Sequence, residues 1–503
     1  MNVTTFLDHL QITENPFLAE EAGQDSVFSR VDHDCRHPDF DKILGDLARP
    51  ATSIVFGERG SGKTAIRLQI ESAIAEHNET HPGERCLLIP YDDLNPALDR
   101  FSRAHGGRRS SQAVLDEMTL ADHVDAMLMA IVPNIVDQLL EENGDQVGPL
   151  HIDGGRWRKL LDDSKKRDLL MLQICYDRPD LALPRTDRLR RAARWNRRSQ
   201  LPLLRFGAIA TAALGAAGAA AFLIMQPTEL AWAWQACLIL LGVLALGLAS
   251  RFGWMWMRGH SAGRELAKAI RVAHRTPESF RRAVSAVHVD EVRAANLPHR
   301  TGDEPRYAML GRLRSVIRAF GYTSIVVVVD RVDEPTMIGG EMSRMRSFVW
   351  PVLSHKFLQQ DGVGFKLLLP LELRYQVDRE GGEFFRLARL DKQNFIDRLS
   401  WTGATLYDVC SARVNACRPP GAEPISLMAM FDDSVTPQEL VDALDQLQQP
   451  RDAFKFLYRL IQEHCSNVPE ERPAFAIARE TLDAVRKQQT ARMTEMLRGV
   501  RPA

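Results

Sequence analysis

Four short apolar segments of the chain are rich in Val, Ile and Leu and predict β-strands. The segment 324–329 reads SIVVVV, and such a continuous run of β-branched residues is typical of a strand buried on both faces of a parallel sheet. Segments with helical periodicity, such as 119–140, lie between the predicted strands. This alternation favours the α/β class. The other predicted strands cover 52–56, 86–91 and 365–369.

Two stretches of 20 residues, 206–225 and 230–249, contain no charged residue. At about 1.5 Å per residue each spans about 30 Å, the thickness of a bilayer's hydrocarbon core. The connection QPTE at 226–229 is short enough for a tight antiparallel hairpin. The pattern therefore predicts two transmembrane helices. The alternative is a buried hairpin of a soluble protein, which the lack of a polar face disfavours.

Basic residues flank both stretches and determine the predicted topology. By the positive-inside rule both ends of the hairpin stay on the cytoplasmic side, and only 226–229 reaches the far side. The localisation that follows is the inner (cytoplasmic) membrane, multi-pass, with both termini cytoplasmic. Anionic lipid headgroups explain the arginine run 185–198 better than nucleic acid does, because the run adjoins a span. The flanking residues are Arg185, Arg188, Arg190, Arg191, Arg194, Arg197, Arg198, Arg205, Arg251, Arg258, Arg264, Lys268, Arg271 and Arg275.

Small residues recur four apart in the first stretch, at Gly207, Thr211, Gly215 and Ala219. Such a stripe allows close helix packing, either within the hairpin or between protomers. No Asp, Glu, Lys, Arg or His lies within either stretch. The intramembrane ionisable groups typical of an ion-coupled transporter are therefore missing.

Composition narrows the class of protein further. The 503 residues suffice for about three domains, and 64 basic against 65 acidic residues give a formal charge of −1. A charge so close to zero gives no whole-molecule attraction to nucleic acid. The seven cysteines form no CxxC pair and no zinc-type cluster, which favours a reduced chain facing the cytosol. The first 20 residues do not resemble a cleaved signal peptide.

The strongest chemical signal is the segment GERGSGKT between the predicted strand 52–56 and a helical pattern. It matches GxxxxGK[ST] in the strand-to-helix context that a phosphate-binding loop requires. The glycines let successive backbone N–H groups point at a phosphate, and the following helix adds positive potential. We expect Lys63 to reach the β- and γ-phosphates of a nucleotide and Thr64 to bind Mg²⁺. The alternative is a degenerate loop that binds nothing. The loop comprises Gly57, Glu58, Arg59, Gly60, Ser61, Gly62, Lys63 and Thr64.

The acidic segment DRVDE follows the predicted strand 324–329. Asp330 comes directly after that strand, where the Mg²⁺-orienting acid of a P-loop ATPase lies. Hydrolysis also needs a carboxylate that positions the attacking water, and Asp333 and Glu334 are the candidates. The alternative for the whole segment is an acidic turn after a core strand.

Two arginines are candidates for contacting the nucleotide. Arg374 lies just beyond the predicted strand 365–369, where a cation could sense the γ-phosphate. A surface salt bridge is the alternative for this residue. Arg451 lies in the first turn of a predicted amphipathic helix, and its alternative is a solvated helix start without a catalytic part.

GERGSGKT together with DRVDE resembles the additional-strand P-loop ATPases, and two branches of that class compete. VVVVDRVDE resembles the Walker B motif of STAND-type switch ATPases, except that Arg331 replaces a tiny residue. KAP-type ATPases resemble the chain in having membrane spans between Walker A and Walker B. They also have a Pro-Arg-Asp that opens a late helix, matched by Pro450, Arg451 and Asp452. The Walker B motif of KAP-type ATPases usually begins with two adjacent acids, and the second is absent here.

The resemblance implies a three-layer, parallel-sheet P-loop NTPase core with an inserted transmembrane hairpin and a C-terminal helical lid. ATP and Mg²⁺ are the implied cofactors, and an arginine of the lid or of a neighbouring protomer would contact the nucleotide. The expected parts are a lead segment, the Walker A half of the core, a basic helix with the hairpin, the Walker B half of the core, and the lid. Their ranges are 1–50, 51–182, 183–285, 286–400 and 401–503.

The expected function is a membrane-anchored, cytosol-facing ATPase that acts as a nucleotide-dependent switch or assembly motor. We expect a homo-oligomer in the lipid bilayer with a further protein partner. A part in bacterial antiviral defence or in a stress complex is implied by the resemblance alone. The alternatives are a nucleic-acid-remodelling ATPase tethered to the membrane and a nucleotide-binding scaffold without turnover.

Overall fold

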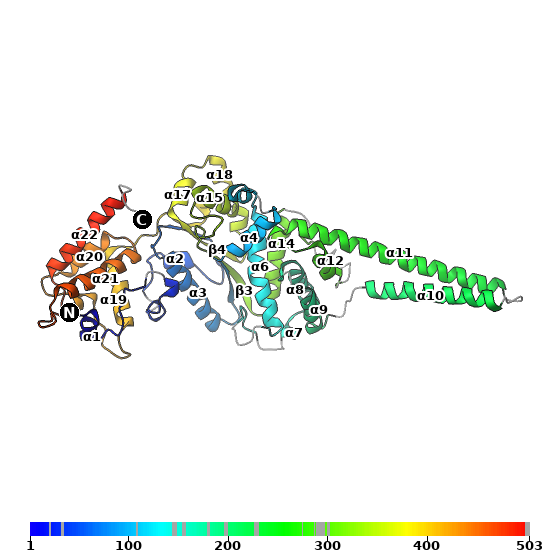
Figure 1. Ribbon diagram of the computed structural model, residues 1–503, viewed down its shortest axis with the longest axis horizontal. Coiled ribbons are helices and arrows are strands. Elements are labelled where there is room, and N and C mark those ends of the chain that lie inside the picture. The colour runs from blue at the N-terminus through cyan, green and yellow to red at the C-terminus, as the bar shows by residue number, and fades with distance from the viewer. Residues whose placement is uncertain are drawn as a thin grey trace. The chain divides into compact units, whose positions relative to one another are not determined.

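The computed structural model describes most of the chain, in two compact units (Figure 1). Unit 1 comprises Met1–Thr80, Val326–Asp333 and Leu353–Ala503; unit 2 comprises His81–Ile325 and Glu334–Val352. The hairpin tip at 226–229 and the flanking Arg197 and Arg198 lie outside the described residues. Those residues are 1–19, 22–31, 35–106, 109–142, 148–152, 157–178, 182–195, 200–225, 231–273, 275–285, 287, 297–298 and 302–497.

A five-stranded, all-parallel sheet makes the protein a mixed α/β fold. The strand order is β2-β3-β4-β1-β5, so that β4 lies between β1 and β3. Gly57 at the end of β1 is paired with Pro370 at the end of β4. The four predicted strands are confirmed, whereas β5 was missed because it has only three residues. The strands are β1 (Ser53–Gly57), β2 (Arg85–Tyr91), β3 (Tyr322–Val329), β4 (Val363–Pro370) and β5 (Asn394–Ile396).

Unit 1 contains the helices that follow β1 and β4 and a group of helices near the C-terminus. The C-terminal helices surround one hydrophobic cluster, to which Phe6 and Leu7 from the start of the chain also belong. The last helix begins at Arg479, shortly after Ile477, which forms a parallel bridge with Phe431. The α-helices are α1 (Val3–His9), α2 (Phe40–Leu44), α3 (Lys63–Thr80), α16 (His355–Leu358), α17 (Leu371–Val377), α18 (Gly382–Ala388), α19 (Gly403–Ala416), α20 (Pro437–Asp445), α21 (Pro450–Asn467) and α22 (Arg479–Leu497).

Unit 2 is mainly helical and is built around α6, which is buried along most of its length. Helices α8 and α14 pack against α6 and against each other. The α-helices are α4 (Asn95–Ala104), α5 (Ser111–Leu115), α6 (Leu120–Leu139), α7 (Trp157–Leu160), α8 (Asp163–Tyr176), α9 (Ala182–Ala192), α10 (Leu201–Met225), α11 (Ala231–Ala269), α12 (Pro277–Ser285), α14 (Glu304–Arg318) and α15 (Met342–Val349). Short 3₁₀ helices include η1 (Ala22–Gln24), η2 (Phe28–Arg30), η6 (Leu390–Lys392) and η7 (Leu427–Met430) in unit 1, and η4 (Arg271–Ala273) and η5 (Trp350–Val352) in unit 2.

The two uncharged stretches form the long helices α10 and α11, which run side by side and extend beyond the other helices of unit 2 (Figure 1). Both are long and apolar enough to span a membrane, with mean hydropathies of 1.9 and 2.0. None of the most apolar part of either helix is buried, which contradicts the alternative of a buried soluble hairpin. Two glycines of the small-residue stripe face α11: a Cβ on Gly207 would lie 3.3 Å from Leu248, and one on Gly215 would lie 3.9 Å from Leu241. These positions therefore serve packing within the hairpin.

Three of the flanking arginines have their partners within unit 2, contrary to their predicted place at lipid headgroups, and two of them are buried. Arg185 is buried and forms an ion pair with Asp137 at 2.5 Å. Arg275 is also buried and donates a hydrogen bond to the carbonyl of Ile174 at 2.6 Å. Arg271 is partly exposed and contacts Asp122 of α6 as well as His105 and the carbonyl of Glu117. The prediction failed here because it used only the neighbouring positions in the sequence. The partners of these arginines lie far away in the sequence.

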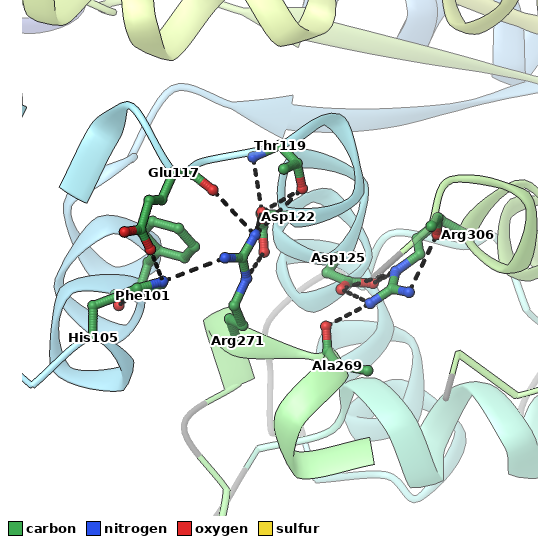
Figure 2. Close-up of polar contacts among 10 residues, drawn as sticks. Phe101, His105, Glu117, Thr119, Asp122, Asp125, Ala269, Arg271 and Arg306 are labelled. Atoms are coloured by element: carbon green, nitrogen blue, oxygen red, sulfur yellow. Dashed lines mark hydrogen bonds and ion pairs between the residues drawn. The ribbon is translucent and has the colours of Figure 1, made fainter. Parts of the chain in front are cut away.

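Two arginine–aspartate pairs hold the C-terminal end of α11 against α6 (Figure 2). Arg271, just beyond α11, donates from Nε to Asp122 Oδ1 at 2.9 Å. Arg306 and Asp125 are both fully buried and lie 2.9 Å apart. Arg306 also donates to the carbonyl of Ala269, the last residue of α11, at 2.6 Å. Burial raises the pKa of Asp125 to about 6, against the opposing effect of Arg306. Together, these contacts fix the end of α11 in unit 2.

Replacing Arg306 with Leu should destabilise unit 2, because it leaves the buried Asp125 carboxylate without its counter-charge. The loss of one member of a buried pair typically costs about 3–5 kcal/mol. We expect a clear fall in the thermal unfolding midpoint of the detergent-solubilised protein. Arg306→Leu combined with Asp125→Leu should recover much of that loss.

Arg282→Leu is the matched control, since Arg282 pairs with Glu278 at the surface of the same unit. This variant should unfold at nearly the wild-type temperature. If Arg306→Leu were as stable as Arg282→Leu, the Arg306 pair would not be what holds α11.

Candidate functional site

The segment between β1 and α3 has the backbone geometry of a tight loop. β1 ends at Gly57 and α3 begins at Lys63. Gly60 and Gly62 both have φ of +96°, a conformation that is strained for any residue with a side chain. A Cβ on Gly57 would lie only 2.4 Å from Ser61 Oγ. The backbone conformation or the close packing of the loop thus requires glycine at all three glycine positions of GERGSGKT.

The side chain of Lys63 lies against the loop that precedes it. Its Nζ donates to the carbonyl oxygens of Gly57 at 2.7 Å and Glu58 at 2.9 Å. Burial lowers the pKa of Lys63, while the negative charges of Asp330, Asp333 and Glu372 oppose that shift. Three carboxylates therefore lie within electrostatic reach of one ammonium group.

Thr64 and Asp330 come together although 266 positions separate them in the sequence. The Thr64 hydroxyl donates to Asp330 Oδ2 at 3.1 Å. Burial raises the pKa of Asp330, against the effects of the Arg331 backbone N–H, Lys63 and the Thr64 hydroxyl. Arg67, one turn further along α3, places Nε 3.6 Å from Asp330 Oδ2. The predicted meeting of the glycine loop and the acid after β3 is thus present.

The oxygen atoms at this point suit Mg²⁺. A protein usually holds this ion by one or two side-chain oxygens, with substrate phosphates and waters as the other ligands. The Thr64 hydroxyl and the Asp330 carboxylate meet that need. Ser61 Oγ is also buried in the loop and has no hydrogen-bond partner among the described residues. No group of three or more His, Cys, Asp or Glu side chains that could hold a metal without a substrate occurs in the described part of the chain.

The glycine loop is also in contact with residues that precede two of the C-terminal helices of unit 1, α19 and α21. Trp401 Nε1 donates to the carbonyl of Ser61 at 2.8 Å. The Glu58 carboxylate accepts from Arg398 at 2.7 Å and from the Gln449 amide. No local sequence signal identified Trp401, Arg398 or Gln449, because these contacts are made between residues more than 300 positions apart.

Arg451 lies beside the loop at the start of α21. A Cβ on Gly60 would lie 3.1 Å from Arg451 Cβ and 3.2 Å from its Cδ. The positive charge of Arg451 contributes to the lowered pKa of Lys63. The structure therefore brings this candidate to the loop. The Arg59 side chain, in contrast, is exposed.

The other predicted arginine, Arg374, is held elsewhere. Its guanidinium pairs with Asp378 and donates to Asp397 at 2.8 Å, and it lies 5.2 Å from the centre of the Phe395 ring. This arrangement is the surface salt bridge given above as the alternative. Two carboxylates already neutralise the charge that was expected to meet a phosphate.

The acidic candidates do not share one environment. Asp333 belongs to unit 1, and its charge raises the pKa of Lys63. Glu334 is exposed and belongs to unit 2. Glu372, two residues beyond the end of β4, was not predicted as a site residue. The signal that could have identified it is the one that identified Asp330: an acid directly after a buried strand.

Replacing Trp401 with Phe should loosen the glycine loop, because the Ser61 carbonyl loses its hydrogen bond inside the protein. Such a loss costs about 1–3 kcal/mol, so amide exchange in the peptide 57–64 should become about fivefold faster or more. Hydrogen–deuterium exchange read by mass spectrometry measures this directly.

Trp195→Phe is the control, because Trp195 is equally buried but its Nε1 has no hydrogen-bond partner among the described residues. Exchange in the loop should not change in this variant. An unchanged rate in Trp401→Phe as well would show that the hydrogen bond does not hold the loop closed.

No family model matches the chain, and no curated protein or solved structure matches it either.

Proposed function

We propose that the protein is a membrane-anchored, cytosol-facing P-loop ATPase that works as a nucleotide-dependent switch or assembly motor. The observation that carries the proposal is the hydrogen bond between Thr64 and Asp330, with Lys63 beside it. A hydroxyl, a carboxylate and an ammonium group at the end of a glycine loop are the groups that Mg²⁺ and a nucleoside triphosphate require.

The strand order supports the same proposal. The class that GERGSGKT and DRVDE resemble is named for an additional strand, and β4 lies between the strand before the glycine loop and the strand before Asp330. A parallel sheet brings the carboxyl ends of all its strands to one edge, where ligands of α/β proteins bind. Residues from β1, β3 and β4 can therefore act on one ligand.

Each residue has a definite task in this proposal. The backbone N–H groups of the loop and Lys63 Nζ bind the phosphates. The lysine then gives up its hydrogen bonds to the carbonyls of Gly57 and Glu58 and donates to phosphate oxygens instead. Thr64 and Asp330 would hold Mg²⁺, which when bound neutralises the charge of the β- and γ-phosphates. Arg451 adds a positive charge from α21, so the C-terminal helices can respond to the bound nucleotide.

The hairpin of α10 and α11 anchors the ATPase in the bilayer in this proposal. The exposed cations Arg191, Arg194, Arg205 and Arg251 remain available to anionic headgroups, whereas Arg188 is paired with Glu142. The nucleic-acid alternative loses support, because Arg185, Arg271 and Arg275 are engaged inside unit 2. The scaffold without turnover remains the second candidate, and measured hydrolysis separates the two.

Lys63→Ala should weaken ATP binding at least tenfold and abolish hydrolysis, because the phosphates lose their main positive charge. Fluorescent-nucleotide titration and single-turnover phosphate release, with protein in detergent or nanodiscs, measure the two effects. Lys392→Ala removes an exposed lysine of the same unit and should behave as wild type. Equal phosphate release in wild type and Lys63→Ala would remove the enzyme proposal, and ATP binding without any release would leave the scaffold.

Cysteine labelling tests the topology. In intact bacterial spheroplasts a membrane-impermeant maleimide should label a Thr228→Cys variant, because the hairpin tip is the part expected outside. Native Cys35, which is partly exposed, should react only after lysis. A Cys237→Ser background removes the exposed cysteine within α11. Labelling of Cys35 in intact spheroplasts would reverse the proposed orientation.

A further inference from the structure

Glu372 stands out because it lies just beyond the end of β4, a central strand of the sheet. β4 is the strand between β1 and β3, and its last residue, Pro370, is paired with Gly57, the first residue of the glycine loop. Adjacent strands of a sheet lie about 4.8 Å apart. Glu372 follows Pro370 by two positions, in the first turn of α17. It therefore leaves the sheet immediately beside the loop, on the side of the loop that faces Asp330.

The carboxylate of Glu372 is available for a ligand. It is exposed, and among the described residues no hydrogen bond or ion pair to its side chain occurs. Its neighbour Arg374 has a different environment, since two carboxylates hold it. The charge of Glu372 raises the pKa of Lys63, which places the carboxylate within electrostatic reach of that ammonium.

The other acids near Lys63 are less suited to the same task. Asp330 is buried and bonded to Thr64, and it lies 3.6 Å from Arg67. Glu334 belongs to unit 2 and has interactions of its own. The charge of Asp333 also raises the pKa of Lys63. Asp333, however, follows β3 by four positions, whereas Glu372 follows β4 by two. Glu372 is the acid that combines a free carboxylate with a place just beyond β4, the strand next to the loop.

We propose that Glu372 is the catalytic carboxylate that holds and deprotonates the water attacking ATP; this inference depends on the ATPase function proposed above. The water oxygen forms a bond to the γ-phosphorus, and the bond from that phosphorus to the β–γ bridging oxygen breaks. The bridging oxygen leaves with the electron pair as part of ADP. The proton of the water passes to the Glu372 carboxylate and from there to solvent.

The test is single-turnover hydrolysis of ATP by the full-length protein in nanodiscs, with ATP binding measured on the same samples. A general base contributes about 100-fold or more to a rate. Glu372→Gln keeps the shape of the side chain but cannot accept the proton. We expect it to lower phosphate release at least 100-fold and to leave the affinity for ATP within about threefold. Glu372→Asp should keep part of the activity and the pH dependence of the wild type.

Glu383→Gln is the matched control, since Glu383 is an exposed acid in the first turn of the next helix, α18. Hydrolysis by Glu372→Gln at the rate of this control would overturn the inference, as would a loss seen only in Asp333→Asn or Glu334→Gln. ATP binding by the wild type without turnover would refute the role of Glu372 and leave nucleotide binding intact. Failure of the wild type to bind ATP would instead refute the proposed function itself.

Discussion

The hydrogen bond between Thr64 and Asp330 is the constraint on which the candidate site depends. It joins the first turn of α3 to the residue after β3, and both ends are reached through strands of one parallel sheet. The 266 positions between them include nearly all of unit 2. The entropic cost of closing a flexible loop grows only slowly with its length, so a long insertion between two halves of a sheet is tolerable once the strands pair. The pairing of the sheet thus makes the insertion compatible with an intact site.

Burial of charge is the second physical theme of the molecule. Lys63, Asp330 and the Arg306–Asp125 pair are all charged groups that the fold removes from water. Each has partners that offset the desolvation cost: carbonyls for the lysine, a hydroxyl for Asp330, and a bidentate guanidinium for Asp125. Lys63 is partly exposed at the glycine loop, whereas the Arg306–Asp125 pair is closed to solvent. The kind of partner and the exposure to solvent, more than burial alone, distinguish the charged groups of the candidate site from a charged pair that stabilises the interior of unit 2.

Local signals explain which parts of the fold and site could be predicted from the sequence. β1, β3 and β4 are almost wholly buried strands, and the glycines of GERGSGKT mark a loop that needs positive φ at Gly60 and Gly62. Asp330 could be predicted because it follows the most apolar strand of the chain. β5 could not, because two of its three side chains are only half-buried and no alternation is visible over such a length.

Partners that lie far apart in the chain explain what the sequence could not show. The sequence predicts Arg185 to be a cation at the lipid headgroups, but it is paired with Asp137. It predicts Arg374 to sense a phosphate, but this residue is paired with Asp378 and Asp397. Which side chains are already paired is visible only in three dimensions.

The continuity of α11 has a mechanical consequence. The helix runs unbroken from Ala231 to Ala269, and its C-terminal end is fixed by Arg306 and Arg271. A helix of this length is about 58 Å long and bends little, so it behaves as a stiff rod clamped at one end. If its apolar half lies in a bilayer, a thinner or thicker membrane would demand a different tilt. A change of tilt would place a torque on the contacts of the buried Arg306 and the partly exposed Arg271, and lipid thickness would thereby act on the folded part of unit 2.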